Sequence, residues 1–225
     1  MHLTPDQLVF FRWGFFHLNA TVVFTWVLMA LLTIGSWLLT RHLAGPEEPG
    51  SRWQNAIEAI VGTIRRQIQS MCPVGADTYL PFVGTLFLFI VGSSLLEVLP
   101  GWHAPTASLS TTAALAISVG VAVPVFGVLR QGFAEYFRHY LRPTPIMLPF
   151  HLLSETSRNL ALAIRLFGNI MSEGLILAML VMIAPFFMPV PMQVLALLTG
   201  VIQAYVFALL AMVYITAAVQ RGQEG

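Results

Sequence analysis

Five apolar stretches of the sequence, each near 20 residues or longer, predict helices that cross a membrane. A bilayer core of about 30 Å requires about 20 apolar residues of helix. No segment shows the alternation of apolar and polar residues over about ten positions that a membrane strand would need. The sequence therefore predicts an all-α membrane protein with five crossings, formed by a single polytopic domain over residues 1–225. The predicted spans are 17–40, 80–99, 111–129, 149–188 and 192–219.

The segment 51–70 has a different pattern and predicts a sixth helix. Ile57, Ile60 and Ile64 recur at helical spacing, while Arg65 and Arg66 fall on other faces. This arrangement is typical of an amphipathic helix that lies at a membrane surface. We expect it on the cytoplasmic side.

The last two predicted spans are too long to stand upright in a bilayer. At 1.5 Å per residue, a single helix over 149–188 would be about 60 Å long, twice the thickness of the apolar core. Such a helix must tilt strongly, unless the segment forms two shorter helices with a break near Arg158. A Pro-rich turn at 185–191 leads into the last helix, which is also long. We expect a strongly tilted antiparallel hairpin.

The distribution of charge is consistent with a membrane protein and gives its orientation. Charged residues make up 9% of the chain, whereas soluble domains carry about 25%. Arginines gather in one set of loops, and the opposite loops, 100–110 and 185–191, contain no Lys or Arg. The positive-inside rule then places the N-terminus outside and the C-terminus in the cytoplasm.

The sequence gives no indication of catalysis or of a cofactor. The net charge of +1 suggests no nucleic-acid partner. No phosphate-binding glycine loop, metal-ligand cluster or nucleophile–base arrangement is present. We therefore expect a non-catalytic protein that holds neither a cofactor nor a metal ion.

Polar and ionisable residues follow one face of the segment 149–188. Residues seven apart on a helix differ by about 700° of rotation, so each points only about 20° from the previous one. A charge within a span costs about 2.5–3.5 kcal/mol on insertion scales and therefore tends to mark an ion pathway or a buried pair. Four residues have the spacing of seven and two more lie one turn away: His151, Arg158, Arg165 and Ser172, with Glu155 and Asn169.

Arg165 is the residue of this stripe that the sequence singles out. It lies deep in the span, and its own helix has no acid three or four residues away. It either pairs with Glu97 or Glu173, or its partner belongs to another chain. Arg158, His151 and Glu155 could instead lie among the lipid headgroups.

The last helix offers two polar residues on one face. Gln203 and Tyr214 are eleven apart, which places them within about 20° of each other. Gln203 could approach Arg165 if the last two helices pack antiparallel. It could equally form an ordinary hydrogen bond between helices.

The segment LAIRLFGNIMSEGLI at 162–176 resembles the signature of subunit a of F-type ATP synthases, the membrane stator subunit beside the rotating c-ring. Other segments are similar to the same family, in the same order along the chain. They are QNAIEAIV at 54–61, LLEVLPG at 95–101, APTASLSTT at 104–112, the lead-in SETSRNL at 154–160 and IQAYVFALLAMVYI at 202–215.

The resemblance implies a role for Arg165 as the family's essential arginine. In that mechanism two offset aqueous half-channels reach the c-ring, a c-subunit carboxylate loses its proton beside the arginine, and H⁺ flow drives rotation. A guanidinium holds its proton too tightly to relay the proton itself. The implied partners are the c-ring, a b-type stator subunit, other ATP synthase subunits and the lipid of a bacterial inner membrane. The expected channel-lining residues are Asn169, Glu173, Ser172, Gln203, Tyr214, Glu97, His151, Glu155 and Arg158.

Several positions depart from the family pattern. Glu173-Gly174 stands where the family has Gly followed by Glu or His, Asn159 replaces a frequent proline, and Thr199 and Ala196 stand where a His or acid is common. These changes leave open Na⁺ transport, as in the compact sodium-translocating N-type subgroup. The sequence is also compatible with a stand-alone secondary transporter, in which Glu97 or Glu173 is the ion site, and with a purely structural membrane subunit.

Overall fold

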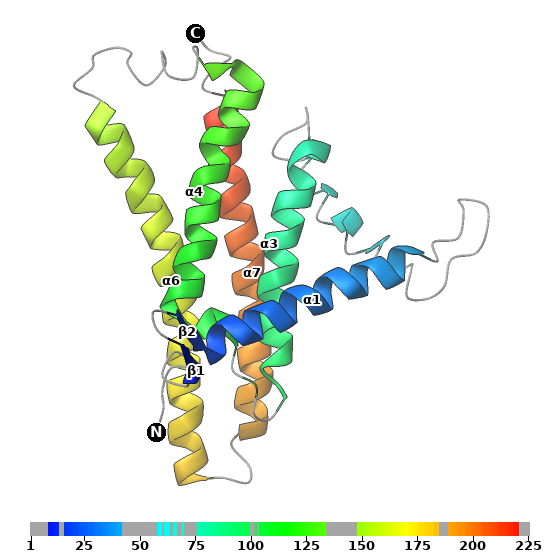
Figure 1. Ribbon diagram of the computed structural model, residues 1–225, viewed down its shortest axis with the longest axis vertical. Helices are drawn as coiled ribbons and strands as arrows, with labels where there is room; N and C mark the ends of the chain where they lie inside the picture. Colours follow the sequence, from blue (N-terminus) through cyan, green and yellow to red (C-terminus); the bar gives the residue numbers. More distant parts are fainter. Residues whose placement is uncertain are drawn as a thin grey trace.

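The computed structural model shows five long helices (Figure 1). They are α1 (Ala20–Arg41), α3 (Ala76–Leu96), α4 (Leu109–Gln131), α6 (Leu148–Ile183) and α7 (Pro189–Gln220). Each contains an apolar segment long enough to cross a membrane, which confirms the predicted all-α membrane fold. The structure describes residues 9–13, 16–41, 58–59, 61–63, 65–66, 69, 76–99, 102, 104–133, 148–184 and 189–220.

A small hairpin precedes α1 and was not predicted. Strand β1 (Val9–Trp13) pairs antiparallel with β2 (Phe16–Asn19). Apolar and aromatic residues, which favour extended structure, dominate these segments. The helix that was predicted from residue 17 therefore begins at Ala20, because the preceding residues belong to β2.

The predicted surface helix at 51–70 is described only at 58–59, 61–63, 65–66 and 69, where the backbone is helical. The remaining positions of that prediction lie outside the described residues.

The segment around Arg165 forms one continuous helix of 36 residues, α6. The single long helix is thus confirmed, and the break considered near Arg158 is wrong. The helix ends at Ile183 rather than at 188, because Pro185 disfavours the helical conformation in the residue before it. Helix α7 starts earlier than predicted, with Pro189 in its first position, where the missing N–H costs nothing.

Four helices, α3, α4, α6 and α7, form the main bundle, and their buried side chains make one apolar core. Close helix contacts depend on small residues, as in other membrane bundles. A Cβ atom at Gly200 of α7 would lie 2.6 Å from the Cβ atom of Ser94 in α3. A short 3-10 turn, η2 (Pro105–Ala107), leads into α4, and the Thr106 hydroxyl lies 2.9 Å from that of Ser93.

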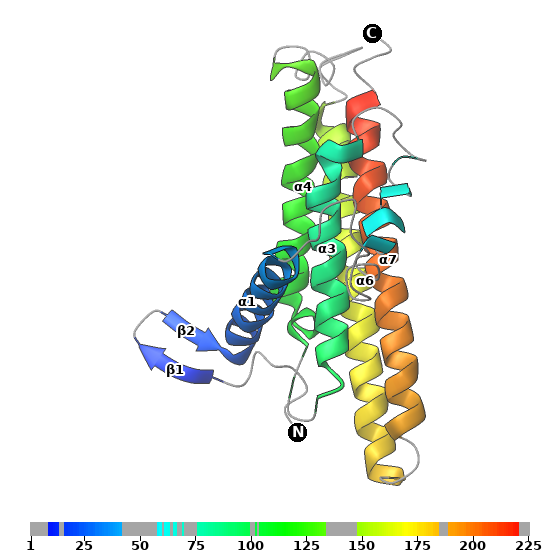
Figure 2. The same cartoon turned by 90° about the vertical axis from the view of Figure 1, so that its right-hand side faces the viewer.

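Helix α1 runs across the bundle at a steep angle to its long axis (Figure 1). The view from the side shows α6 and α7 next to each other, with α1 and the hairpin projecting on one side (Figure 2). Helix α1 packs mainly against α3, and many of its large apolar side chains are exposed. The membrane normal therefore cannot be parallel to both α1 and α6.

Candidate functional site

The polar side chains of α6 and α7 meet along one line between the two helices, which we call the seam. Three cross-helix pairs define it. From one pair to the next, the residue number on α6 rises by eleven and then by four. The residue number on α7 falls by eleven and then by four. The three pairs therefore share one antiparallel register. They are Arg158–Tyr214, Asn169–Gln203 and Glu173–Thr199.

The central pair of the seam is a hydrogen bond. The Asn169 Nδ2 donates to Gln203 Oε1 at 2.8 Å. Gln203 is buried, whereas Asn169 is exposed. The bond therefore ties a buried amide to a residue one turn beyond Arg165. Asn169 and Gln203 are therefore hydrogen-bonded to each other. Gln203 does not bond to Arg165.

Arg165 lies next to the seam on the exposed side of α6. Among the described residues, none forms a hydrogen bond or an ion pair with its guanidinium. The possible internal ion pairs with Glu97 and Glu173 are absent from the structure. For Glu173 the helix explains this, because eight residues separate it from Arg165 by about 12 Å along the axis.

The exposed surface beside Arg165 is largely apolar, with Asn169 and Ser172 as polar members. On both helices the seam lies between the core side and the exposed side, and we call the exposed sides of α6 and α7 together the outer face. Arg165 is the charged residue of this surface in the described part of α6 and α7. Its apolar members are Ile164, Ile176 and Met179 of α6 with Leu198, Val201, Ile202 and Tyr205 of α7.

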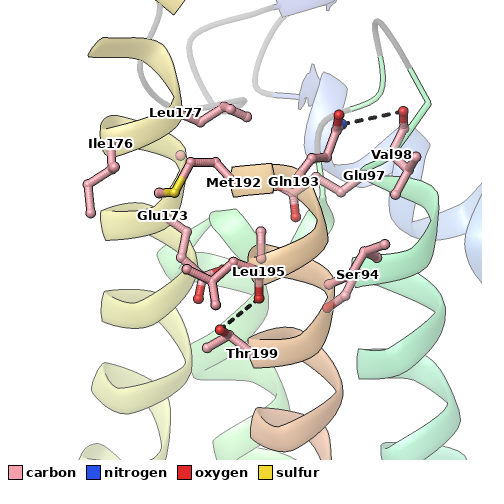
Figure 3. Close-up of a pocket in the computed structure, with 13 residues that line it drawn as sticks. Ser94, Glu97, Val98, Glu173, Ile176, Leu177, Met192, Gln193, Leu195 and Thr199 are labelled. Carbon is pink, nitrogen blue, oxygen red and sulfur yellow. Dashed lines mark hydrogen bonds between the residues drawn. The ribbon is translucent and has the colours of Figure 1, made fainter. Parts of the chain in front are cut away.

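A cavity of about 110 Å³ opens at the end of the seam that contains Glu173 (Figure 3). Its polar wall combines Glu173 from α6, Thr199 and Gln193 from α7, and Ser94 and Glu97 from the end of α3. Gln193 Nε2 donates to the Val98 backbone oxygen at 3.5 Å. The rest of the lining is apolar, and a cavity of this size has room for several water molecules at its polar wall.

Glu97 is the carboxyl group of this cavity that lies outside the spans. It follows Leu96, the last residue of α3 and of its membrane-length segment. Burial, and to a lesser degree the nearby Glu173, raises the pKa of Glu97 from 4.5 to about 7. Near neutral pH this carboxyl group can therefore both take up and release a proton.

The opposite end of the seam holds the remaining ionisable residues of the predicted stripe. The Cζ atom of Arg158 lies 4.6 Å from the centroid of the Tyr214 ring. His151 and Glu155 lie further toward the start of α6 and are partly buried. Between this end and the Asn169–Gln203 bond, the buried side chains are apolar, namely Leu162, Leu166 and Phe207.

Ser172 lies apart from both ends. Its side chain is exposed, and its hydroxyl donates to the Gly168 backbone oxygen of the same helix at 2.6 Å. The structure thus places this residue near the outer face rather than in the cavity.

Sequence reasoning missed three contributions to the site. Thr199 was noted only as a departure from a family pattern, yet its side chain lies beside the Glu173 carboxyl group. Ser94 and Gln193 line the cavity without having been singled out. The spacing of four between Thr199 and Gln203 could have identified the first, because it repeats the spacing of Glu173 and Asn169.

Membrane-length helices in an apolar bundle, a surface arginine that no described residue pairs with, and a cavity lined by Glu97 and Glu173 define an integral membrane protein. A family model described as "ATP synthase A chain" matches residues 22–216. The chain is 57% identical to ATP synthase subunit a 2 of Acaryochloris marina over 224 residues, 100% of this chain and 95% of that protein. Identity to ATP synthase subunit a 1 of Crocosphaera subtropica is 53%, over 100% and 97% of the two chains. Identity to ATP synthase subunit a 1 of Chlorobium luteolum is 52%, over 100% of both chains.

This chain belongs to the ATP synthase subunit a family. The relatives come from bacteria, and together with the five membrane-length helices they make this a bacterial membrane protein. As a member of this family, the chain is a component of an ATP synthase complex.

Proposed function

We propose that this chain is the ion-translocating stator subunit of a rotary ATP synthase, which couples H⁺ flow to rotation of a c-ring. The observation that carries the proposal is Arg165, whose charge lies on the largely apolar outer face of a membrane span without a partner in the described chain. A charge in that position requires an opposite charge or water to offset its cost. A carboxylate on each c subunit supplies that charge as the ring turns past.

The chemistry at Arg165 is a change of proton affinity in the ring carboxyl group. A guanidinium next to a carboxylate favours the ionised form, because the attraction is strong where water is excluded. The ring acid releases its proton to water as it reaches Arg165, and the carboxylate takes up another proton after leaving it. Arg165 keeps its own proton throughout. It therefore separates the two aqueous routes. The chain carries out no ATP chemistry, which belongs to other subunits.

The two ends of the seam supply the two half-channels in this proposal. The cavity with Glu97, Glu173 and Thr199 lies where α3 and α6 end and α7 begins, and the segments 100–110 and 185–191 that follow α3 and α6 contain no Lys or Arg. We assign this route to the outer side of a bacterial inner membrane. The second route reaches Arg165 from the cytoplasmic end, past His151, Glu155 and Arg158. The apolar side chains between the ends keep the routes apart.

The tilt of the hairpin follows from its length and from the position of α1. The 36 residues of α6 extend about 54 Å at 1.5 Å per residue. Helix α1 has 22 residues, which suits an upright crossing, and it runs at a steep angle to α6 (Figures 1 and 2). We therefore place α1 near the membrane normal, with the N-terminus outside, and α6 and α7 inclined along the c-ring. A b-type stator subunit and lipid are the further partners.

A Na⁺-translocating version of the same subunit is the second candidate. The cavity brings two carboxyl groups, two hydroxyls and an amide oxygen together, and oxygen ligands of this kind suit a hard cation. A stand-alone secondary transporter is the third candidate, because Glu97 and Glu173 are close enough to interact electrostatically.

One experiment separates these candidates. The whole complex is reconstituted into liposomes and ATP-driven uptake of H⁺ and of ²²Na⁺ is measured, with the purified subunit alone as the control. We expect H⁺ uptake by the complex that needs no Na⁺, and no ion-coupled transport by the subunit alone. Uptake that requires Na⁺ supports the second candidate, and transport by the isolated subunit contradicts the stator proposal.

A further inference from the structure

The contact between Arg158 and Tyr214 is directional rather than a matter of packing alone. The guanidinium Cζ lies 4.6 Å from the ring centroid. The Arg158 Nε atom is buried and has no hydrogen-bond partner among the described residues. A cation is attracted by the negative face of an aromatic ring, and the attraction grows as water is excluded. The ring face of Tyr214 therefore binds this guanidinium through a cation–π contact.

Arg158 and Asn169 bracket Arg165 along α6. The first lies seven residues before it and the second four residues after it. Their partners, Tyr214 and Gln203, lie on one face of α7. The buried side chains between the two pairs are apolar, and apolar contacts have no preferred direction. These two polar pairs, one on each side of Arg165, are thus directional contacts that specify how α6 is rotated there.

Asn159, the residue after Arg158, contacts a second neighbouring helix at the same height along α6. The Asn159 amide lies directly against Gly120 of α4, in the space that a side chain at position 120 would need. Successive helical residues differ by about 100°. Arg158 therefore faces α7 while Asn159 faces α4, so the helix is fixed between two neighbours two turns before Arg165.

We propose that Arg158 is a positioning residue for Arg165. Its stack on Tyr214, together with the Asn169–Gln203 bond, fixes the rotation of α6 about its own axis and so the direction of the Arg165 side chain. Residues seven apart point within about 20° of each other. A rotation that takes Arg158 off the ring therefore turns Arg165 away from the outer face by the same angle. This inference rests on the proposed function, because its readout is the coupling of transport to ATP hydrolysis.

The test changes the electron density of the ring and leaves its shape almost unchanged. In the whole complex in membrane vesicles, Tyr214 is replaced by Phe and then by Phe with one, two and three ring fluorines. The measured quantity is the ratio of ATP-driven ion pumping to ATP hydrolysis. With Tyr214→Phe as the reference, we expect the ratio to fall stepwise with fluorination, by about threefold or more for the trifluoro ring. A ratio that does not depend on fluorination overturns the proposal.

A double-mutant cycle supplies the second arm. Arg158→Gln and Tyr214→Leu are compared alone and together, and the amount of the subunit in the purified complex is measured for each. Residues that act as one pair are non-additive, so the double variant should couple no worse than the poorer single variant. Fully additive losses overturn the proposal. If Tyr214→Leu does not assemble, the fluorine series, which keeps the ring in place, decides the matter.

The failure of this inference is distinguishable from failure of the proposed function. Coupled transport that survives Arg165→Ala contradicts the stator proposal itself. If Arg165→Ala abolishes coupling and the fluorine series has no effect, the stator proposal stands and Arg158 is not a positioning residue.

Discussion

Replacing Arg165 with alanine should abolish ATP-coupled ion transport while the complex still assembles. Removing a preorganised charge or donor at a reacting group commonly lowers a rate by about 10²–10³-fold, and we expect coupled pumping to fall by at least about a hundredfold. The physical reason is that the ring carboxyl group loses the charge that favours its ionised form. The measurement is ATP-driven pumping in vesicles, together with the ATPase activity of the same complexes.

The matched control for this prediction is Arg130→Gln. Arg130 is exposed in the last turn of α4 and lies outside both ends of the seam. Its loss removes the same charge from the chain, and pumping should stay within about twofold, as for most surface substitutions. Retained pumping in Arg165→Ala would refute the assigned role. Loss of the subunit from the complex would instead point to a purely structural role.

The second large effect is expected from the carboxyl groups of the cavity. Positioned proton donors and acceptors contribute about 10²–10⁴-fold to proton transfer, so Glu97→Gln together with Glu173→Gln should lower pumping by at least about tenfold. The amides keep size and hydrogen-bonding capacity but cannot exchange a proton. Pumping in vesicles is again the measurement, and Glu58→Gln, at an exposed position of the predicted surface helix, is the control.

The role of Glu97 alone is tested by the pH dependence of pumping in the single variant Glu97→Gln. During ATP-driven pumping, Glu97 takes the proton that leaves the ring, so it must be ionised. Its pKa is about 7, and pumping by the parent should therefore decline as the pH on the cavity side falls below that value. In Glu97→Gln this inflection should be missing and the rate lower at neutral pH. An unchanged profile in the variant would exclude Glu97 from the ion path.

Periodicity pointed to two of the three α6 residues of the seam, Arg158 in the spacing of seven and Asn169 one turn from that stripe. The spacing of seven identified His151, Arg158, Arg165 and Ser172, because helical geometry fixes which residues of one helix share a face. The spacing of eleven identified Gln203 and Tyr214 in the same way. The spacing does not show which neighbouring helix that face contacts, or whether it faces outward. Arg158 meets α7 and Ser172 faces outward, although both belong to the same stripe.

The cavity was less predictable than the seam. Its wall joins Glu97 to Glu173, which are far apart in the sequence, and nothing in either local pattern links them. Their meeting depends on how closely α3 approaches α7, and Gly200 against Ser94 sets that approach. The hairpin β1–β2 was missed for a related reason: its short aromatic strands continue directly into an apolar helix, and hydropathy does not separate the two.

The structure of the assembled complex in the membrane tests the central claim most directly. The quantity to measure is the distance from the Arg165 guanidinium to the nearest carboxyl group of the c-ring. We expect this carboxyl group to lie within about 6 Å, close enough for the charge to shift its proton affinity, with the outer face of α6 and α7 against the ring. Arg165 pointing into lipid, or paired with an acid of another subunit while the ring passes elsewhere, would contradict it.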